Sequence, residues 1–410
     1  MLNAAPWTAR APHRRWLETQ ADALMSFYET RSMDPHGGFY LLDDAGRPTP
    51  DAARPLHLTA RMAHCAAIGV LRGRPGAQNL LDHAMASIWT HHRDTGKGGY
   101  FWSFDARGPR EREKLAYGHG FVLLAGASAK VAGHPDADRL IADISQVLTD
   151  RFWEKDAGAF AEEFRDDWAP FSFYRGQNAN MHMTEALMAA FEATGEAEYL
   201  ARAESVADLI LRRGAGAADW RVPEHYREDW SVDLDYRGSD MFRPYGYTPG
   251  HALEWTRLAL QLWALGGKRL GWLPDAAQAL FAQAVAQGWE ETRGGLYYTL
   301  EYDGKARVRD RLWWPVCEGV AAAHFLGRAR DEASAERWYR KFWNFAAAHF
   351  VDPERGGWRH HLDEELRPIP GYFHGKPDLY HALQACLIPL YGVSGSLTRE
   401  IALAEAQPAP

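Results

Sequence analysis

Apolar residues recur at steps of three and four positions in six segments spaced along the chain. This spacing is typical of helices with one buried face. In the third segment it is shown by Leu140, Ile144, Val147 and Leu148. The pattern predicts helices over residues 17–29, 79–92, 137–151, 197–211, 276–288 and 334–349.

A short motif of two small residues and an aromatic follows each of these helices. Gly37-Gly38-Phe39 is a clear copy, whereas the fourth copy, Ala218-Asp219-Trp220, is degenerate. The last positions of the motifs are residues 39, 100, 160, 220, 296 and 358, with gaps of 61, 60, 60, 76 and 62. Gaps this regular indicate an internal repeat, and the glycines suit tight turns.

A second helix-like segment follows each motif. These segments begin near residues 55, 117, 178, 249, 315 and 377, and four of the six starts carry proline, which is favoured in a first helical turn. The fourth repeat holds roughly ten extra residues within 231–248. Units of roughly 60 residues exceed the usual solenoid repeats, so we expect a closed ring.

The expected fold is therefore all-α, an (α/α)6 barrel of six inner and six outer helices with short β-hairpins between them. We expect one domain over residues 1–410, with its core at about 14–392. The tail after Gly392 is expected to form a short helix with a frayed end.

Composition narrows the class of protein. The 410 residues carry a net charge of −8, which argues against a nucleic-acid partner. Three widely spaced cysteines fit a reducing compartment, and neither a signal peptide nor an apolar span is visible. We expect a cytoplasmic protein with no membrane partner. The 17 tryptophans fit either an aromatic core or a sugar site.

The inner helices of such a barrel all begin at one end, so their first turns should meet at a central pocket. His182, His251 and His381 occupy equivalent places in three repeats, which favours a shared catalytic role over coincidence. Glu185 and Glu254 each follow a histidine by three positions, where a carboxylate can fix a tautomer.

Further candidates lie near the same helix starts. An arginine at the mouth could bind sugar hydroxyls or an anionic group, and the aromatic residues could form either pocket wall or core. We expect catalysis by His381, His251, His182 and Glu254, and substrate binding by Arg54, Tyr117, Asn178, Arg243, Trp314 and Glu318.

Three stretches carry a resemblance to a known family: NANMHMTEA at 178–186, TPGHALEW at 248–255 and KPDLYHALQ at 376–384. Together they resemble the N-acylglucosamine 2-epimerase superfamily, whose members are (α/α)6 barrels that act on free sugars. The resemblance implies that His251 and His381 are the principal catalytic pair, with His182 as a third active-site histidine. It implies polar neighbours at Asn178 and Glu254 and a substrate-binding arginine at Arg54. A second binding arginine would be Arg243 or Arg237.

Within that superfamily, Glu254-Trp255 is similar to the branch of aldose–ketose isomerases, which holds mannose isomerase and sulfoquinovose isomerase. The resemblance implies interconversion of a free aldose and ketose, first D-mannose and D-fructose, with no cofactor and no metal. The reaction would pass through a cis-enediol(ate), with histidine moving the proton.

Several alternatives stay open. A sugar 2-epimerase or a sulfoquinovose isomerase would use the same site, and lyxose is another candidate substrate. A glycosidase of the same fold would use two carboxylates, for which Glu254, Glu318 and Asp378 are candidates. Three histidines could instead hold a metal, or the chain could be a protein-binding module like the renin-binding protein of the superfamily. The sugar and the oligomeric state, including a homo-oligomer, are undecided.

Overall fold

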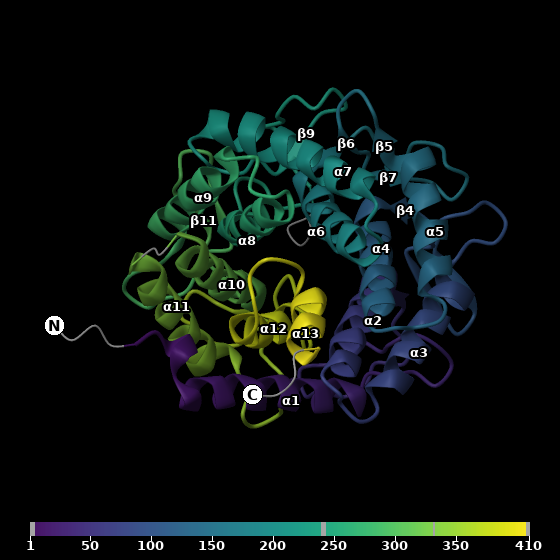
Figure 1. Ribbon diagram of the computed structural model, residues 1–410, viewed down its shortest axis with the longest axis horizontal. Coiled ribbons are helices and arrows are strands. Elements are labelled where there is room, and N and C mark those ends of the chain that lie inside the picture. The colour runs from purple at the N-terminus through teal and green to yellow at the C-terminus, as the bar shows by residue number, and fades with distance from the viewer. Residues whose placement is uncertain (1–4, 239–242, 331–332, 407–410) are drawn as a thin grey trace.

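The computed structural model describes residues 5–238, 243–330 and 333–406. Six inner helices form a ring and six outer helices surround it, which confirms the predicted (α/α)6 barrel (Figure 1). The inner helices are α2 (Leu56–Leu71), α4 (Ala116–Val131), α6 (Gln177–Thr194), α8 (Pro249–Leu265), α10 (Trp313–Arg330) and α12 (Tyr380–Leu387). The outer helices are α1 (Ala11–Glu29), α3 (Ala77–Ser87), α5 (Ala137–Val147), α7 (Ala197–Ala207), α9 (Trp272–Gly288) and α11 (Ala333–Phe345).

The ring closes between the two ends of the chain. Each outer helix from α3 to α11 packs on the inner helix that precedes it, and α1 packs on α12. The Tyr28 hydroxyl of α1 donates a hydrogen bond to the Pro377 carbonyl, just before α12. The first and last helices of the barrel therefore form one junction (Figure 1).

The burial of each helix explains why the spacing of apolar residues revealed the outer helices more clearly than the inner ones. The outer helix α5 buries Leu140, Ile141 and Ile144 and exposes its other face. The inner helix α4 is buried on nearly every side, and its glycines let neighbours approach closely. A Cβ at Gly118 would lie 2.9 Å from Leu56 Cδ2. Inner helices therefore have no polar stripe from which a period could be read.

Short antiparallel strands connect the repeats at one end of the barrel. Four pairs join the residues before an inner helix to the hairpin of the next repeat: β1 (Arg54–Pro55) with β2 (Ser103–Asp105), β4 (Lys114–Leu115) with β7 (Glu163–Phe164), β8 (Arg175–Gly176) with β9 (His225–Tyr226), and β12 (Arg311–Leu312) with β13 (His361–Leu362). In register, Arg54 lies opposite Phe104 and Arg175 opposite Tyr226. These pairs fix the positions of the inner-helix starts.

The remaining strands are local hairpins: β3 (Gly108–Glu111) pairs with β2, β5 (Trp153–Glu154) with β6 (Ala159–Phe160), and β10 (Thr299–Leu300) with β11 (Ala306–Val308). The glycine motifs form the expected tight turns. Gly98 and Gly99 have φ angles of 77° and 75°, a left-handed backbone that glycine adopts without strain. In the degenerate fourth copy, Asp219 and Trp220 adopt positive φ instead.

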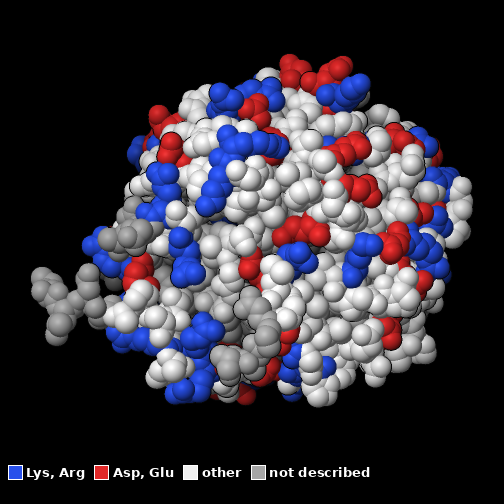
Figure 2. All heavy atoms as spheres, in the orientation of Figure 1, with Lys and Arg blue, Asp and Glu red and all other residues white. Residues whose placement is uncertain are grey.

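The tail contains a helix, α13 (Leu397–Glu405), as expected. It begins beyond residue 392, yet it packs against α2, α4 and α6 and buries Leu397 and Ile401. Packed structure therefore extends past the predicted core limit. No helix among the described residues is long and apolar enough to cross a membrane. Basic and acidic side chains are interspersed on the face in Figure 2, which shows no continuous basic stripe.

Candidate active site

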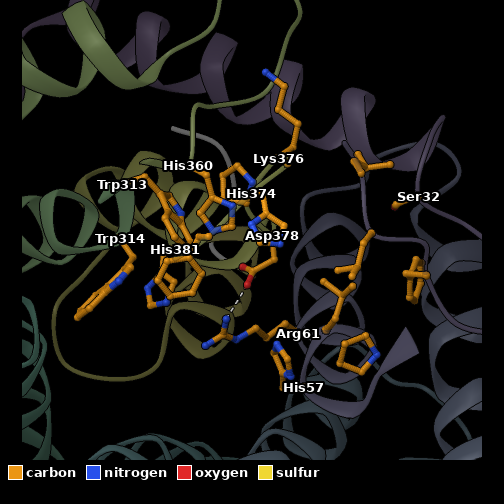
Figure 3. Close-up of a pocket in the computed structure, with 18 of the residues that line it drawn as sticks. Ser32, His57, Arg61, Trp313, Trp314, His360, His374, Lys376, Asp378 and His381 are labelled. Atoms are coloured by element: carbon orange, nitrogen blue, oxygen red, sulfur yellow. Dashed lines mark hydrogen bonds and ion pairs between the residues drawn. The ribbon is translucent and has the colours of Figure 1, made fainter. Parts of the chain in front are cut away.

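A cavity of about 580 Å³ lies at the end of the barrel where the inner helices begin. Its wall includes residues from the first two turns of inner helices, which confirms that the helix starts converge (Figure 3). The lining from these helix starts is His57, Leu58, Arg61, Met62, Tyr117, Asn178, His182, His251, Glu254, Trp313, Trp314, Asp378 and His381. Loops before α2 and α12 complete the cavity.

His251, on the first turn of α8, is held by a buried carboxylate that lies 27 residues earlier in the same repeat. Its Nδ1 lies 2.9 Å from both carboxylate oxygens of Glu224. Glu224 also accepts from the Gln177 side chain at 2.8 Å and from the Thr248 backbone N–H at 3.2 Å. Burial would raise the pKa of Glu224, but His251 and these hydrogen bonds hold it below its ordinary value. Nε2 is then the nitrogen of His251 available to the cavity.

His381, on the first turn of α12, has a matching arrangement. Its Nδ1 lies 2.8 Å from Glu318 Oε1, and Glu318 lies behind it rather than in the cavity wall. Burial would raise the pKa of Glu318, but Arg257 and the hydrogen bond with His381 hold it below its ordinary value. The structure therefore presents two carboxylate–histidine pairs at one cavity.

His182 of α6 is the third histidine, and its setting differs. Its Nδ1 is buried without a hydrogen-bond partner among the described residues. The nearest carboxylates are Glu254 Oε1 at 3.6 Å and Glu185 Oε2 at 3.9 Å. Burial lowers the pKa of His182 to about 3, so this imidazole is neutral at physiological pH. It can accept or donate one hydrogen bond, but it carries no charge.

Behind the histidines, a single guanidinium faces three buried carboxyl groups. Arg257 lies 3.1 Å from Glu185, 3.3 Å from Glu318 and 3.6 Å from Glu254. Burial and the nearby charge of Glu318 raise the pKa of Glu254 well above its ordinary value. This shift favours the protonated form of Glu254 in the cavity wall, and neither of its oxygens has a hydrogen-bond partner among the described residues.

Some of the histidines and carboxyl groups in and behind the cavity wall lie close enough together to be considered as metal ligands. Two sets of side-chain atoms lie close together, His182 with Glu185 and Glu254, and Glu254 with Glu318 and His381. Both sets face Arg257, which already supplies a positive charge to all three carboxyl groups. A divalent ion here would have to compete with a buried guanidinium, so the donor set does not favour a metal.

Near these histidines, Arg61 of α2 binds two other residues of the cavity wall. It lies 2.6 Å from Asp378 and 2.8 Å from the Tyr117 hydroxyl (Figure 3). Burial would raise the pKa of Asp378, but Arg61 holds it down at about 2. A charged pair is thus fixed beside the histidines, where it can bind hydroxyl or carbonyl oxygens.

Aromatic rings cover much of the remaining wall. The Trp314 ring lies over His251 with 4.9 Å between centroids, and Trp313 meets His360 edge-on at 4.2 Å. His360 in turn stacks on Phe373 at 5.0 Å. Flat rings beside hydrogen-bonding groups suit the C–H faces and hydroxyls of a sugar.

Two of the expected binding arginines do not line the described cavity. Arg54 pairs with Asp34 and lies 4.9 Å from the ring centroid of Tyr40. Arg243 pairs with Glu163 at 2.6 Å and stacks on Tyr174, while the alternative, Arg237, stacks on Tyr245. Residues 239–242 of the same loop lie outside the described residues.

All the other expected site residues except Glu318 are brought together: His381, His251, His182, Glu254, Tyr117, Asn178 and Trp314 line the cavity. Glu318 was expected to bind substrate, but it lies outside the cavity wall and holds His381 Nδ1 instead. One expected partnership is wrong. Glu254 was expected to orient His251 because it lies three residues later, but Glu224 holds that ring. The α8 helix turns Glu254 toward His182 instead.

Sequence reasoning missed four residues of the site: Glu224, Gln177, Arg61 and Arg257. Arg61 could have been found, because it lies about one helical turn after His57 on a helix start that converges on the pocket. Glu224 could not, because it precedes β9 in the degenerate repeat and reaches His251 only through the β8–β9 pairing.

Comparison with known proteins gives one consistent result. Residues 37–385 match the N-acylglucosamine 2-epimerase (GlcNAc 2-epimerase) family. A D-mannose isomerase from Thermobifida fusca is 42% identical over 97% of this chain and 98% of its own length. One from Pseudomonas cannabina pv. alisalensis is 41% identical over 97% of both. The crystal structure of a D-mannose isomerase matches with a TM-score of 0.87 at 33% identity, over 92% of this chain and 97% of the other.

Proposed function

Because the chain belongs to the N-acylglucosamine 2-epimerase family, we propose that it is a D-mannose isomerase, which interconverts D-mannose and D-fructose without a cofactor. Relatives with that name match it over nearly their full lengths at 41–42% identity. A small free sugar would be its partner. A cytoplasmic location and the oligomeric state remain predictions.

One observation carries the proposal: two histidines face one cavity, each with Nδ1 fixed by a buried carboxylate. This leaves the Nε2 atom of each histidine for proton transfer. Imidazole suits this task because its ordinary pKa lies near neutrality. The surrounding wall supplies hydrogen-bonding groups and aromatic rings but no pair of free carboxylates. Glu318 is bound to His381 and Asp378 to Arg61, so of the three carboxyl groups proposed for a glycosidase only Glu254 has no partner among the described residues, and it could supply the acid but not the second carboxylate. The site therefore suits proton transfer better than glycoside hydrolysis.

The reaction moves a proton next to a carbonyl group. The pyranose opens to the C1 aldehyde, and His381 takes the proton from C2, so that a cis-enediol(ate) forms. His381 then returns the proton to C1 on the same face, and the O2 hydroxyl proton passes to O1, so that O2 becomes the ketone oxygen and O1 becomes a hydroxyl. His251 assists ring opening, while His182 and Arg61 bind the oxygens on which negative charge develops.

A 2-epimerase would need a proton returned to C2 from the opposite face, so it would need a second base there. The presence of two carboxylate–histidine pairs makes this outcome worth testing directly. Proton NMR of the purified protein with D-mannose in D₂O, with EDTA present, separates the two. Fructose is the expected product, and glucose appearing first would replace the proposal by an epimerase. Absence of any product would reject mannose as the substrate.

The catalytic assignment has its own test. His381→Asn keeps a polar side chain but removes the base, so turnover should fall by about 10³-fold or more if His381 moves the C2 proton. Near-normal turnover of this variant would remove His381 from the proposed mechanism. Circular dichroism should show an unchanged fold.

A further inference from the structure

The two carboxylate–histidine pairs differ in their charge environment. Glu318 faces a guanidinium as well as a histidine, since Arg257 Nε lies 3.3 Å away. Glu224 pairs with no arginine or lysine in the part of the chain that is described. Its other contacts, the Gln177 amide and the Thr248 N–H, are neutral donors. The imidazole of His251 is therefore the group that can balance the charge of Glu224.

Among the described residues, the other titratable groups near Glu224 cannot balance its negative charge in place of His251. His225 follows Glu224 in sequence, but burial lowers the pKa of His225, and its ring nitrogens bond to the Tyr174 hydroxyl and the Pro244 carbonyl. Tyr226 is neutral because burial raises its pKa. No other residue supplies a compensating positive charge at hydrogen-bond distance among those described.

The hydrogen bonds also fix where the His251 proton lies. The Trp255 indole N–H can only donate, and it lies 2.8 Å from Gln177 Oε1. Gln177 Nε2 must then face Glu224, at 2.8 Å, and it also lies 2.9 Å from His251 Nδ1. Two carboxylate oxygens at 2.9 Å from Nδ1 require a hydrogen on that nitrogen. Nε2 is therefore the site of proton exchange with the cavity.

We propose that Glu224 is a positioning residue that keeps His251 doubly protonated in the free enzyme, so that Nε2 donates a proton when the sugar ring opens. The C1–O5 bond breaks as O5 takes the proton from Nε2, which leaves a protonated aldehyde at C1. The O1 proton then returns to Nε2, and His251 regains its starting form. Without Glu224, the start of α8 would oppose a positive imidazole, because helix N-termini disfavour cations. This inference rests on the proposed isomerase function.

The test compares Glu224→Gln with Glu318→Gln, using D-mannose deuterated at C2. Glu224→Gln should lower kcat/KM by about 10- to 100-fold, as expected for loss of a supporting hydrogen-bond partner. Ring opening becomes the slow step, so the deuterium isotope effect on kcat/KM should fall toward one. Glu318→Gln impairs the abstraction step, so its isotope effect should stay at or above that of the wild type.

Two further variants make the result decisive. Glu224→Asp keeps the charge and should recover the wild-type isotope effect at an intermediate rate. Glu192→Gln changes a half-buried glutamate that bonds Ser396, away from the cavity, and should leave both quantities unchanged. An isotope effect that rises or stays constant in Glu224→Gln would overturn the proposal.

A measurement that needs no substrate turnover tests the role of Glu224 separately from the proposed function. In proton NMR, the downfield imidazole N–H resonance that disappears in His251→Asn should move upfield in Glu224→Gln. An unchanged resonance would overturn the role of Glu224 even if mannose is a good substrate. If instead the wild type makes no fructose but the resonance shifts, the pairing stands and the substrate assignment fails.

Discussion

At Arg61, one guanidinium binds a carboxylate and a phenol in the cavity wall, whereas Arg54 binds Asp34 just behind the wall, next to Tyr40 and Ala52. Substitution by lysine keeps the charge but loses the forked geometry. Arg61→Lys should lower kcat/KM by roughly 10- to 100-fold, since a misplaced group in the site costs about that much. Arg54→Lys should lower the melting temperature with a much smaller change in kcat/KM. Steady-state kinetics with thermal unfolding checks both, and equal kinetic losses would place Arg54 back at the substrate.

Glu254 should make the free energy of unfolding depend on pH. Its pKa is raised in the folded protein, so the native state holds a proton that the unfolded chain releases above its ordinary pKa. The protonated Glu254 stabilises the fold fully at pH values below its pKa in the unfolded chain. This stabilisation is lost, by about 1.4 kcal/mol per pH unit, as the pH rises from that pKa toward the raised pKa of the folded protein.

Glu254→Gln cannot titrate and should lose less stability than the wild type as the pH rises above the ordinary glutamate range. Urea unfolding at a series of pH values measures the difference. Glu192 is half-buried and also has a raised pKa, about 7, so Glu192→Gln shows how much of the effect is specific to the cavity. Parallel stability curves for wild type and Glu254→Gln would show that Glu254 is ionised in the native state.

At the scale of the element, α13 rests on three inner helices at the end of the barrel away from the large cavity. Ile401 is fully buried there, whereas Leu403 is 42% exposed on the same helix. Ile401→Ala should reduce the free energy of unfolding by about 2–5 kcal/mol, from lost burial and the cavity left behind. Leu403→Ala should change it by less than about 0.5 kcal/mol. Equal effects in denaturant titrations would mean that α13 does not pack as described.

The element scale also shows what the sequence could and could not reveal. The ends of the outer helices were predicted to within about six residues because each helix shows one polar and one apolar face, as α5 does. Starts of inner helices were found from prolines and repeat spacing, and most of the cavity residues at these starts were found with them, although Arg61 and Gln177 were not. Partnerships between distant positions were not visible: Glu224 meets His251 from the hairpin before α8, and Arg257 meets Glu185 and Glu318 across three helices.

For the whole molecule, the junction of α1 and α12 links barrel closure to the site. The Tyr28 hydroxyl bonds the carbonyl of Pro377, which lies in the cavity wall next to Asp378. Tyr28→Phe leaves that buried carbonyl unpaired, so it should cost about 1–3 kcal/mol of stability. It should also raise KM, because Asp378 loses part of its support.

Tyr339→Phe is the matched control for this junction. It removes the hydrogen bond between His13 of α1 and Tyr339 of α11, 2.8 Å long, which lies outside the cavity wall. Stability should fall while KM stays constant. Measuring both variants by thermal unfolding and kinetics tests the link, and an unchanged KM in Tyr28→Phe would show that closure and substrate binding are independent.

The placement of α1 on α12 has a consequence for synthesis on the ribosome. The apolar face of α1 emerges first, but its partner is translated roughly 350 residues later. At typical elongation rates of about 5–20 residues per second, that interval is roughly 20–70 s. During this time α2 to α10 can stack as an open arc, and α1 can contact the turn after α2 through Arg74 and Glu29, while the face that α12 will cover stays exposed. A nascent chain of this design offers a binding surface to chaperones until its final helices leave the exit tunnel.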